Sequence, residues 1–458
     1  MKHVTFRRSI GLFSCLAGAL AMMGAAPHSN QAREKKDLQA KLARLAPVEL
    51  TADVSRLSSG DRQALSRLIE ASKYMDPIFL RQVWNGNVDL EKKLEADKSP
   101  LGRLRLEWFV RNAGPWSRLD RDEPFIDGVP KEKPSRAGFY PEDLTKAEFE
   151  SWLKTLSEDQ RQAAIGFFTV IDRKDGKLVA IPYSEVYKAW LDPSAKLLKE
   201  AADLTTNASL AKFLRSRADA FSSNNYYASD VDWMDIDAPV DPTIGPYEVY
   251  EDGIFNYKAA FEAFINVRDD AETSKLGRYS GYLQDIENNL PEDDKYKSPK
   301  LGASAPIRVV NEVFAAGDAR RGIATAAYNL PNDEKVNKEK GSKRVLLKNV
   351  QEAKFEKVLM PIAHVVLPPS AVSQVAFDPF FTHILMHELM HGLGPHNLTV
   401  DGKETPVRMQ LKDVYSAIEE AKADITGLYA MQYLIDKGEL PKSLEKSMYT
   451  TYLASMFR

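Results

Sequence analysis

Residues 380–397 read FFTHILMHELMHGLGPHN, and the fold and chemistry of the chain are best predicted from this stretch outward. It contains His387, Glu388 and His391 in the arrangement H-E-x-x-H. On an α-helix, residues four apart lie on the same face, so both imidazoles point to one place and Glu388 flanks it. Two neutral imidazoles beside a carboxylate suit a zinc ion and a base for its bound water. The stretch therefore predicts a helix that carries a metal site.

The residues around this motif support the helix. Asp378-Pro379 is a start signal, and Gly392 and Gly394 mark the end. A buried helix with histidines in it by chance is the alternative, but a chance H-E-x-x-H would occur in roughly one chain of this length in a hundred. Four of the seven histidines of the chain lie close together, which favours a metal site: His383, His387, His391 and His396.

A catalytic zinc site usually has three protein ligands and a water, so a third ligand must come from elsewhere. One candidate is His396, although it follows a proline and comes one residue too early for the pattern H-x-x-G-x-x-H. The other is the acidic run EEAKAD at residues 419–424. Glu420 and Asp424 are four apart and share a helix face, so one can bind the metal while the other accepts the N–H of a ligand histidine.

The acidic run lies on a predicted helix that we expect to approach the H-E-x-x-H helix closely. Its apolar positions are Ala417, Ile418, Ala421, Ile425 and Leu428, and small residues allow the close approach at Ala421, Ala423 and Gly427. This favours the carboxylates over His396 as the source of the third ligand.

The totals describe an ordinary globular protein. With 458 residues the chain can form two lobes, and a formal net charge of −3 argues against nucleic acid or an anionic membrane as partner. The pattern along the chain predicts a mainly α fold with a smaller β portion (α+β), in two lobes with a cleft between them.

The first 29 residues have the layout of a signal peptide. Lys2, Arg7 and Arg8 precede an uncharged run over residues 9–26 that is rich in glycine and alanine and short for a spanning helix. We therefore expect a cleaved leader at 1–29, an exported protein that is periplasmic or secreted, and no transmembrane span in the mature chain. The lone Cys15 loosely fits a lipoprotein anchor, but the apolar run continues past it.

Two regions are expected after the leader, joined by a junction. Residues 30–230 are mostly helical, with a hairpin near 167–181. Residues 222–246, rich in Ser, Asn, Asp and Pro, are the predicted junction of the lobes, and residues 231–458 carry the metal motifs on helices of the C-terminal lobe. Strands are expected near 247–250, 261–267 and 307–314, and the lysine-rich residues 335–348 are expected to form an exposed loop. Because an uncapped apolar run ends at Arg458, we expect this chain to be shorter than its relatives.

The motif HELMH, followed by EEAKAD, resembles the zinc metallopeptidases of the dipeptidyl peptidase III family (metallopeptidase family 49). Its plain five-residue form is similar to the bacterial and plant Nudix-associated branch. Two further stretches are similar to motifs of the family: Glu248-Val-Tyr250-Glu-Asp252 before a F-E-x-F run, and Asn329-Leu-Pro-Asn332-Asp333.

The resemblance implies roles for particular residues. One Zn²⁺ would be bound by His387, His391 and Glu420, with Glu388 as the general base and with Asp424 and Glu419 in the outer shell. Asn329 and Asn332 would hold the free N-terminus of a peptide substrate, with Asp241 taking its ammonium charge. The tyrosine with which the family polarises the scissile carbonyl aligns with Thr243, so no tyrosine is assigned, and the histidine that supports the tetrahedral intermediate would lie past Arg458.

The sequence thus predicts an exported zinc peptidase that releases dipeptides from the N-terminus of peptides. Two alternatives stay open at this point: a zinc endopeptidase, and a non-catalytic protein that binds peptide or metal in the same cleft. An intact Glu388 argues against the second, since a site that only binds needs no base.

Overall fold

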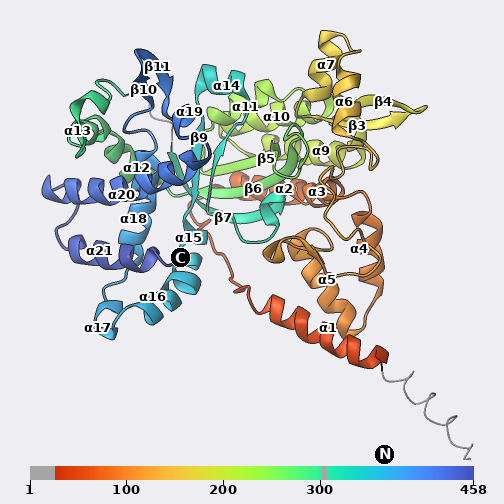
Figure 1. Cartoon of the computed structure of the whole chain (residues 1–458), viewed down its shortest axis with the longest axis horizontal. Helices are drawn as coiled ribbons and strands as arrows, with labels where there is room; N and C mark the ends of the chain where they lie inside the picture. Colours follow the sequence, from red (N-terminus) through yellow and green to blue (C-terminus); the bar gives the residue numbers. More distant parts are fainter. Residues whose placement is uncertain (1–25, 302–306) are drawn as a thin grey trace, which may run out of the picture.

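The computed structural model of the chain describes residues 26–301 and 307–458. Cys15 and the first 25 residues of the predicted leader lie outside the described residues. The fold is mainly helical with one five-stranded sheet, and two lobes flank that sheet (Figure 1). The predicted fold class is therefore confirmed. In the described part of the chain, no helix combines the length and apolar character needed to cross a bilayer.

The central sheet has the strand order β5-β6-β7-β9-β8, in which only β7 and β9 run parallel. Its strands are β5 (Val240–Glu248), β6 (Ala260–Arg268), β7 (Ile307–Gly317), β8 (Ala327–Leu330) and β9 (Lys343–Leu347). The predicted strands at 261–267 and 307–314 are confirmed as β6 and β7. The strand predicted at 247–250 starts earlier, at Val240. Its start was missed in the sequence because β5 contains two prolines, which are rare in strands but are tolerated in an edge strand.

The first lobe is built from the helices that precede the sheet. They are α1 (Ala26–Leu42), α2 (Ser59–Ser72), α3 (Met75–Val83), α4 (Asn87–Ala96), α5 (Pro100–Asn112), α6 (Lys146–Leu153), α7 (Glu158–Ile165), α8 (Tyr183–Val186), α9 (Lys188–Leu204), α10 (Ala208–Ser223) and α11 (Tyr227–Met234). Two hairpins accompany them: β1 (Trp116–Ser117) with β2 (Glu123–Pro124), and β3 (Thr169–Lys174) with β4 (Lys177–Pro182). The second is the hairpin predicted near 167–181.

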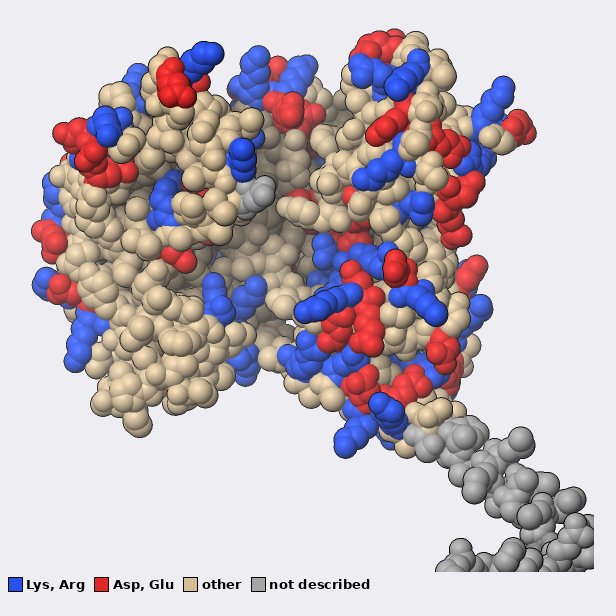
Figure 2. All heavy atoms as spheres, in the orientation of Figure 1, with Lys and Arg blue, Asp and Glu red and all other residues tan. Residues whose placement is uncertain are grey.

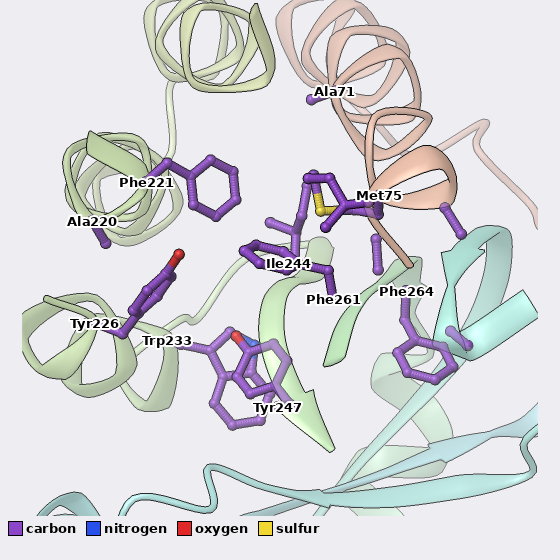
Figure 3. Packing of buried hydrophobic residues seen from close by; sticks show 14 of the residues in the cluster. Ala71, Met75, Ala220, Phe221, Tyr226, Trp233, Ile244, Tyr247, Phe261 and Phe264 are labelled. Atoms are coloured by element: carbon purple, nitrogen blue, oxygen red, sulfur yellow. The ribbon is translucent and has the colours of Figure 1, made fainter. Parts of the chain in front are cut away.

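The core of the first lobe forms where these helices pack on β5 and β6. Figure 3 shows Phe221 and Tyr226 from the helices beside Ile244 and Phe261 from the strands, all of them buried. The prediction of a junction at 222–246 is wrong, because the aromatic residues of this Ser- and Asp-rich segment fill the core: Trp233 is 0% exposed. The two cores accordingly do not divide at the boundary expected near residue 230.

The second lobe follows the chain from the end of β6. Its helices are α12 (Asp270–Ser280), α13 (Leu283–Asn288), α16 (Met360–Val366), α17 (Pro369–Val372), α18 (Phe377–Met390), α19 (Val407–Leu411), α20 (Tyr415–Asp436) and α21 (Leu444–Ser455), with the hairpin β10 (Asn397–Val400) and β11 (Lys403–Pro406). A separate core joins α12, α13, α18, α20 and α21 to the sheet. Figure 2 shows the molecule hollowed between the two lobes.

Helix α14 (Glu334–Lys340) lies between β8 and β9 in the sequence and packs on α11. Helix α15 (Lys348–Lys354) directly follows β9. The lysine-rich segment 335–348 is therefore α14 and β9 rather than an exposed loop. Lys343 in β9 is 0% exposed, since its ammonium donates to the carbonyl of Trp233 and lies over that indole ring.

Candidate metal centre

Helix α18 presents the motif histidines to the cleft because its apolar residues face the other way. Leu385, Met386, Leu389 and Met390 are buried in the core of the second lobe. His387 and His391, spaced four apart, share a different face. The helix ends at Met390 with His391 as its C-cap, and Gly394 beyond it has φ +77°, a conformation that favours glycine. The predicted helix is thus confirmed.

Helix α20 carries the acidic run along the side of α18. At their contact Gly427 permits the close approach, because a Cβ there would lie only 3.0 Å from the backbone nitrogen of His387. Ala423 is fully buried at the same contact. The predicted close approach of the two helices therefore occurs.

The apolar face predicted for α20 is wrong in part. Ile418 and Ile425 are 47% and 64% exposed, and Ala421 is exposed as well. The buried face contains Ala423, Gly427, Ala430, Met431 and Leu434 instead. Close packing at the small residues turns this face to α18, and the two isoleucines are left in solvent.

The structure brings His387, His391 and Glu420 together, with potential ligand atoms all within 4.8 Å of one another. Nε2 of His387 lies 3.2 Å from Nε2 of His391 and 3.2 Å from Oε2 of Glu420, while Nε2 of His391 lies 3.8 Å from Oε1 of Glu420. Ligand atoms about 2.1 Å from a tetrahedral metal ion are roughly 3.4 Å apart. These three side chains therefore fit one bound metal ion.

The proton positions on the two rings also favour a cation. Nδ1 of His387 lies 2.8 Å from Oδ1 of Asp424, and Nδ1 of His391 lies 3.0 Å from Oε1 of Glu419. Ionised carboxylates only accept hydrogen bonds, so each Nδ1 carries the proton and each neutral ring directs a lone pair from Nε2. Two such lone pairs 3.2 Å apart repel each other unless a positive charge lies between them.

The pKa shifts follow from the same contacts. Burial disfavours protonation of His387, but the hydrogen bond to Asp424 and the surrounding carboxylates outweigh it, so its pKa is raised. The hydrogen bond from His387 lowers the pKa of Asp424. Burial opposes ionisation of Glu419, yet hydrogen bonds from Lys422 and His391 hold its pKa below the ordinary value. Both outer carboxylates are thus kept as acceptors.

Glu388 points into the same space and is held by a residue that the sequence did not suggest. Arg344 on β9 donates to the backbone carbonyl of Glu388, and its Nε lies 3.8 Å from Oε2 of the same residue. Strand β9 of the sheet thereby contacts the H-E-x-x-H helix of the second lobe.

The two other histidines of the cluster do not join the three ligand candidates. His396 is exposed, with Nε2 3.3 Å from the carbonyl of Gly392. Nε2 of His383 lies 2.9 Å from the backbone carbonyl of Asp424, and burial lowers its pKa. The geometry thus places Glu420, and not His396, beside the motif histidines.

The residues expected to hold a peptide N-terminus lie on and beside β8. Asn329 and Asn332 are exposed, and Nδ2 of Asn332 donates to the carbonyl of Tyr247 at 3.0 Å. The amide of Asn332 also reaches the carboxyl of Glu248, whose pKa is raised by burial. Tyr250 follows two residues later with 72% of its surface exposed.

Two positions assigned from the family pattern are placed differently by the structure. Asp241 is 1% exposed and faces Nζ of Lys343 at 3.7 Å, so its carboxylate is not open to a peptide. Thr243 is fully buried, where its hydroxyl meets Tyr328 and Trp233. The carboxylate and the phenol that this segment places nearest to solvent belong instead to Glu248, half-buried at the end of β5, and to the exposed Tyr250 beyond it. The E-x-Y pattern formed by Glu248 and Tyr250 is the sequence feature that could have indicated both residues.

A cavity of about 340 Å³ opens beside the site. Its walls include His387, Glu388 and Glu420, with Gln351 from α15 and with Tyr452 and Arg458 from the last residues of the chain. Glu420 is the most exposed of the three ligand candidates, with 60% of its side chain open. A substrate can therefore approach the ion position from the cleft.

Known proteins resemble this chain in sequence and in fold. Residues 157–405 match the sequence model of Peptidase family M49. The solved structure of DPP III from Caldithrix abyssi is 49% identical, with a TM-score of 0.88 over 92% of this chain and 80% of that one. Dipeptidyl-peptidase III from Corallococcus sp. strain EGB is 58% identical, with a TM-score of 0.78 over 92% and 79%.

A curated relative, Nudix hydrolase 3 of Arabidopsis thaliana, is 44% identical over 471 residues. The match takes in 92% of this chain, which spans 61% of the length of that relative.

Proposed function

Because the chain belongs to peptidase family M49, we propose that it is a zinc-dependent peptidase that releases dipeptides from the N-terminus of peptides. The observation that carries this proposal is the convergence of His387, His391 and Glu420 beside the carboxylate of Glu388, which lines the same cavity. Two histidines and one glutamate form a ligand set of catalytic zinc sites that keep one position open.

The protein residues around the zinc position divide into two shells. His387, His391 and Glu420 would hold the ion, while Asp424 and Glu419 fix the histidine rings through their Nδ1 protons. When bound, zinc lowers the pKa of water and polarises a peptide carbonyl. Both outer carboxylates also offset the charge that the ion brings.

Glu388 is the general base in this proposal. It lies next to His387 in sequence and lines the same cavity, so its carboxylate can take a proton from water and later pass it to the leaving amine. Arg344 positions Glu388 by binding both its backbone carbonyl and its carboxylate. The exposed phenol of Tyr250 is our candidate for the donor to the scissile carbonyl, in place of Thr243.

The edge of the sheet offers two places whose separation matches the length of two peptide residues. Asn329 lies directly opposite Arg344 in the antiparallel pair of β8 and β9, so both side chains point to one face, toward Glu388. Asn332 lies three residues further on, at most about 10 Å away. Two residues of an extended peptide span about 7 Å.

A peptide that lies antiparallel to β8 can therefore bind at both places. Its α-ammonium would meet Glu248 and Asn332, and its second peptide bond would then lie near Glu388. β8 is an edge strand, so its outer backbone groups can pair with the peptide. Glu248 takes the role that the family pattern had suggested for Asp241.

The test compares a free hexapeptide with its N-acetylated form, using zinc-loaded full chain and mass analysis of the products. We expect a dipeptide and a tetrapeptide as the first products of the free peptide, and no cleavage of the acetylated form, which lacks the charged donor. Equal cleavage of both at internal bonds would replace the proposal with an endopeptidase. If neither is cleaved by zinc-loaded protein, the peptidase assignment fails.

A matched pair of variants tests the N-terminus site. Glu248→Gln should raise KM for the free peptide about tenfold with zinc content unchanged, because a charge-assisted contact is lost. Glu123→Gln, which removes an exposed carboxylate from β2 in the first lobe, should leave KM unchanged. Equal KM values in the two variants would exclude Glu248 from substrate binding.

We also propose that the protein is exported by a cleaved leader within residues 1–29. The support is the cationic start at Lys2, Arg7 and Arg8 before the uncharged run. Mass analysis of the N-terminus of protein expressed in its native host should find a start between residues 22 and 30. Recovery of only the uncut chain would contradict export by cleavage.

A further inference from the structure

The proposed mechanism leaves two carboxylates of the stretch Glu248–Asp252 without a role. Glu251 and Asp252 directly follow Tyr250, yet only 4% and 0% of their surfaces are exposed. Tyr250 itself is 72% exposed. Acidic side chains are seldom buried unless they are paired or hydrogen-bonded, so the partners of these two indicate what they do.

The chain turns sharply at Tyr250. The N–H of Asp252 donates to the carbonyl of Val249 at 3.1 Å, which closes a four-residue turn with Tyr250 and Glu251 at its centre. The turn comes directly after β5, which ends at Glu248. The direction of the Tyr250 phenol therefore depends on how this turn is held.

The carboxylate of Asp252 binds the backbone that follows the turn. Its Oδ1 accepts the N–H groups of Ile254 and Phe255, both at 3.1 Å. Its Oδ2 accepts those of Tyr257 at 2.8 Å and Lys258 at 3.2 Å. One buried carboxylate thus organises the loop between β5 and β6.

Two further contacts fasten this loop to the first lobe. The hydroxyl of Tyr140 donates to Oδ2 of Asp252 at 2.7 Å. Nζ of Lys258, which is 0% exposed, donates to the carbonyls of Ala164 and Gly166 at 2.7 and 2.9 Å, where α7 ends. The loop therefore cannot shift without breaking bonds to the helical lobe.

Glu251 gives the turn a second set of partners. Nη1 of Arg118 donates to its Oε1 at 2.7 Å, and Nζ of Lys133 lies 2.8 Å from its Oε2. Nε of Arg321, which follows β7, lies 3.6 Å from Oε1. Burial opposes ionisation of Glu251, but the three cations lower its pKa to about 2. Glu251 is therefore an anion that ties the turn to three separate segments.

Tyr250 has no such contact of its own. Its hydroxyl makes no hydrogen bond to any residue in the described part of the chain. The charge of Glu248 and partial burial raise its pKa, so the phenol keeps its proton and can donate it to an acceptor. Because nothing else holds this side chain, the turn alone sets the place from which it extends.

We propose that Asp252 and Glu251 are positioning residues, which fix the turn and thereby direct the phenol of Tyr250 to the carbonyl of the cleaved bond. Neither carboxylate touches the substrate, and each acts through Tyr250. This inference rests on the proposed function for the role of Tyr250 as a hydrogen-bond donor. It gives a reason for two buried acids directly after an exposed tyrosine.

The first test is Asp252→Asn, which keeps the size of the side chain but replaces one acceptor oxygen by an NH₂ group. Two backbone N–H groups then meet a donor instead of an acceptor. Since a displacement of about 1 Å can cost about a hundredfold in rate, kcat should fall at least about tenfold. KM for the free hexapeptide should stay within about twofold of wild type, because the phenol acts in the transition state. Zinc content should be unchanged.

A double-mutant cycle with Tyr250→Phe separates positioning from general destabilisation. Alone, Tyr250→Phe should lower kcat about a hundredfold, the scale for loss of one donor to a developing oxyanion. In that background, Asp252→Asn should lower kcat by less than about twofold, because the group that it positions is already gone. Glu251→Gln should show the same dependence on the phenol. Equal losses with and without the phenol, or no loss in Asp252→Asn alone, would overturn the proposal.

Asp61→Asn is the matched control. Asp61 is a carboxylate of the same lobe, 6% exposed, that accepts hydrogen bonds from two side-chain hydroxyls. Its replacement should lower stability and leave kcat at the wild-type value. Should Asp252→Asn fail to fold, Tyr140→Phe removes a single bond to Asp252. It should lower kcat about threefold when Tyr250 is present and leave kcat unchanged in Tyr250→Phe; any other pattern counts against the proposal.

A measurement that needs no cleavage keeps this inference apart from the proposed function. With fluorotyrosine in place of Tyr250, fluorine NMR of the zinc-loaded full chain should give a resonance distinct from free fluorotyrosine, and Asp252→Asn should move it toward the free value. If peptides are cleaved but neither the resonance nor kcat responds to Asp252→Asn, the positioning proposal is wrong while the peptidase stands. If nothing is cleaved yet the resonance responds, the anchored turn stands and the peptidase assignment falls.

Discussion

Removing the carboxylates that hold the two histidine rings should weaken zinc binding, and the structure predicts which loss is larger. Asp424→Ala takes the acceptor from Nδ1 of His387, and Glu419→Ala takes it from Nδ1 of His391. In each variant the ring can turn and its tautomer is no longer fixed, so Nε2 is less available to the ion.

The size of each effect follows from exposure. A hydrogen bond to a charged group contributes about 1.5–3 kcal/mol. The side chain of Asp424 is 51% exposed, so water replaces much of its effect and we expect about 1.5 kcal/mol, which is about tenfold in zinc affinity. Glu419 is 19% exposed and is also held by Lys422 at 2.9 Å, so its loss should approach a hundredfold.

Competition with a chelator of known affinity measures both variants directly. Asp436→Ala, at the far end of the same helix with 62% of its side chain exposed, is the control and should bind zinc as the wild type does. The reasoning would be refuted if both outer-shell variants bound zinc within twofold of the control. It would also be refuted if the Asp424 variant were the weaker binder by tenfold or more.

Two further predictions concern the third ligand and a buried acid. Glu420→Ala should weaken zinc binding by about a hundredfold or more, whereas His396→Ala should keep full zinc by elemental analysis; the reverse result would overturn the ligand assignment. Burial raises the pKa of Glu312 to about 7 from an ordinary 4.5, so the folded protein holds the proton more tightly and its stability falls as pH rises through that window. In urea titrations, Glu312→Gln should therefore gain on the order of 3 kcal/mol relative to wild type between pH 5 and pH 8, and a constant difference would contradict this.

The parts of the site that lie on helices were predictable because helical geometry is local. The spacing of His387 and His391, and of Glu420 and Asp424, places each pair on one face whatever the rest of the chain does. Small residues such as Gly427 then indicated that the two helices approach closely. Spacing accordingly indicated four of the five residues of the ion site and its outer shell, whereas the role of Glu419 came from the family resemblance.

The residues on strands could not be placed in the same way. Whether Asp241 or Glu248 faces the cleft depends on where β5 begins and on its register with β6, and both are set by pairing with distant residues. Arg344 became a partner of Glu388 only because β9 lies beside α18 in the folded chain. Such contacts carry no local pattern.

Predictions of burial from composition were wrong in two segments, where polar residues accompany a buried segment or apolar residues lie in solvent. The segment 222–246 reads as a linker because Ser, Asn and Asp dominate, yet its aromatic residues enter the core. On α20, Ile418 and Ile425 were expected to be buried but are exposed. The buried face of this helix is formed mainly by small residues instead. Packing at a close helix contact selects small side chains over the most apolar ones.

The central claim is that Glu388 is the base of a zinc-dependent hydrolysis, and Glu388→Gln tests it most directly. Glutamine keeps the size of the side chain and leaves His387, His391 and Glu420 untouched, so the variant should fold and keep its zinc. Its kcat/KM for a free N-terminal hexapeptide should fall at least about a hundredfold, the usual scale for loss of a general base. Near wild-type hydrolysis by the zinc-loaded variant would contradict the account.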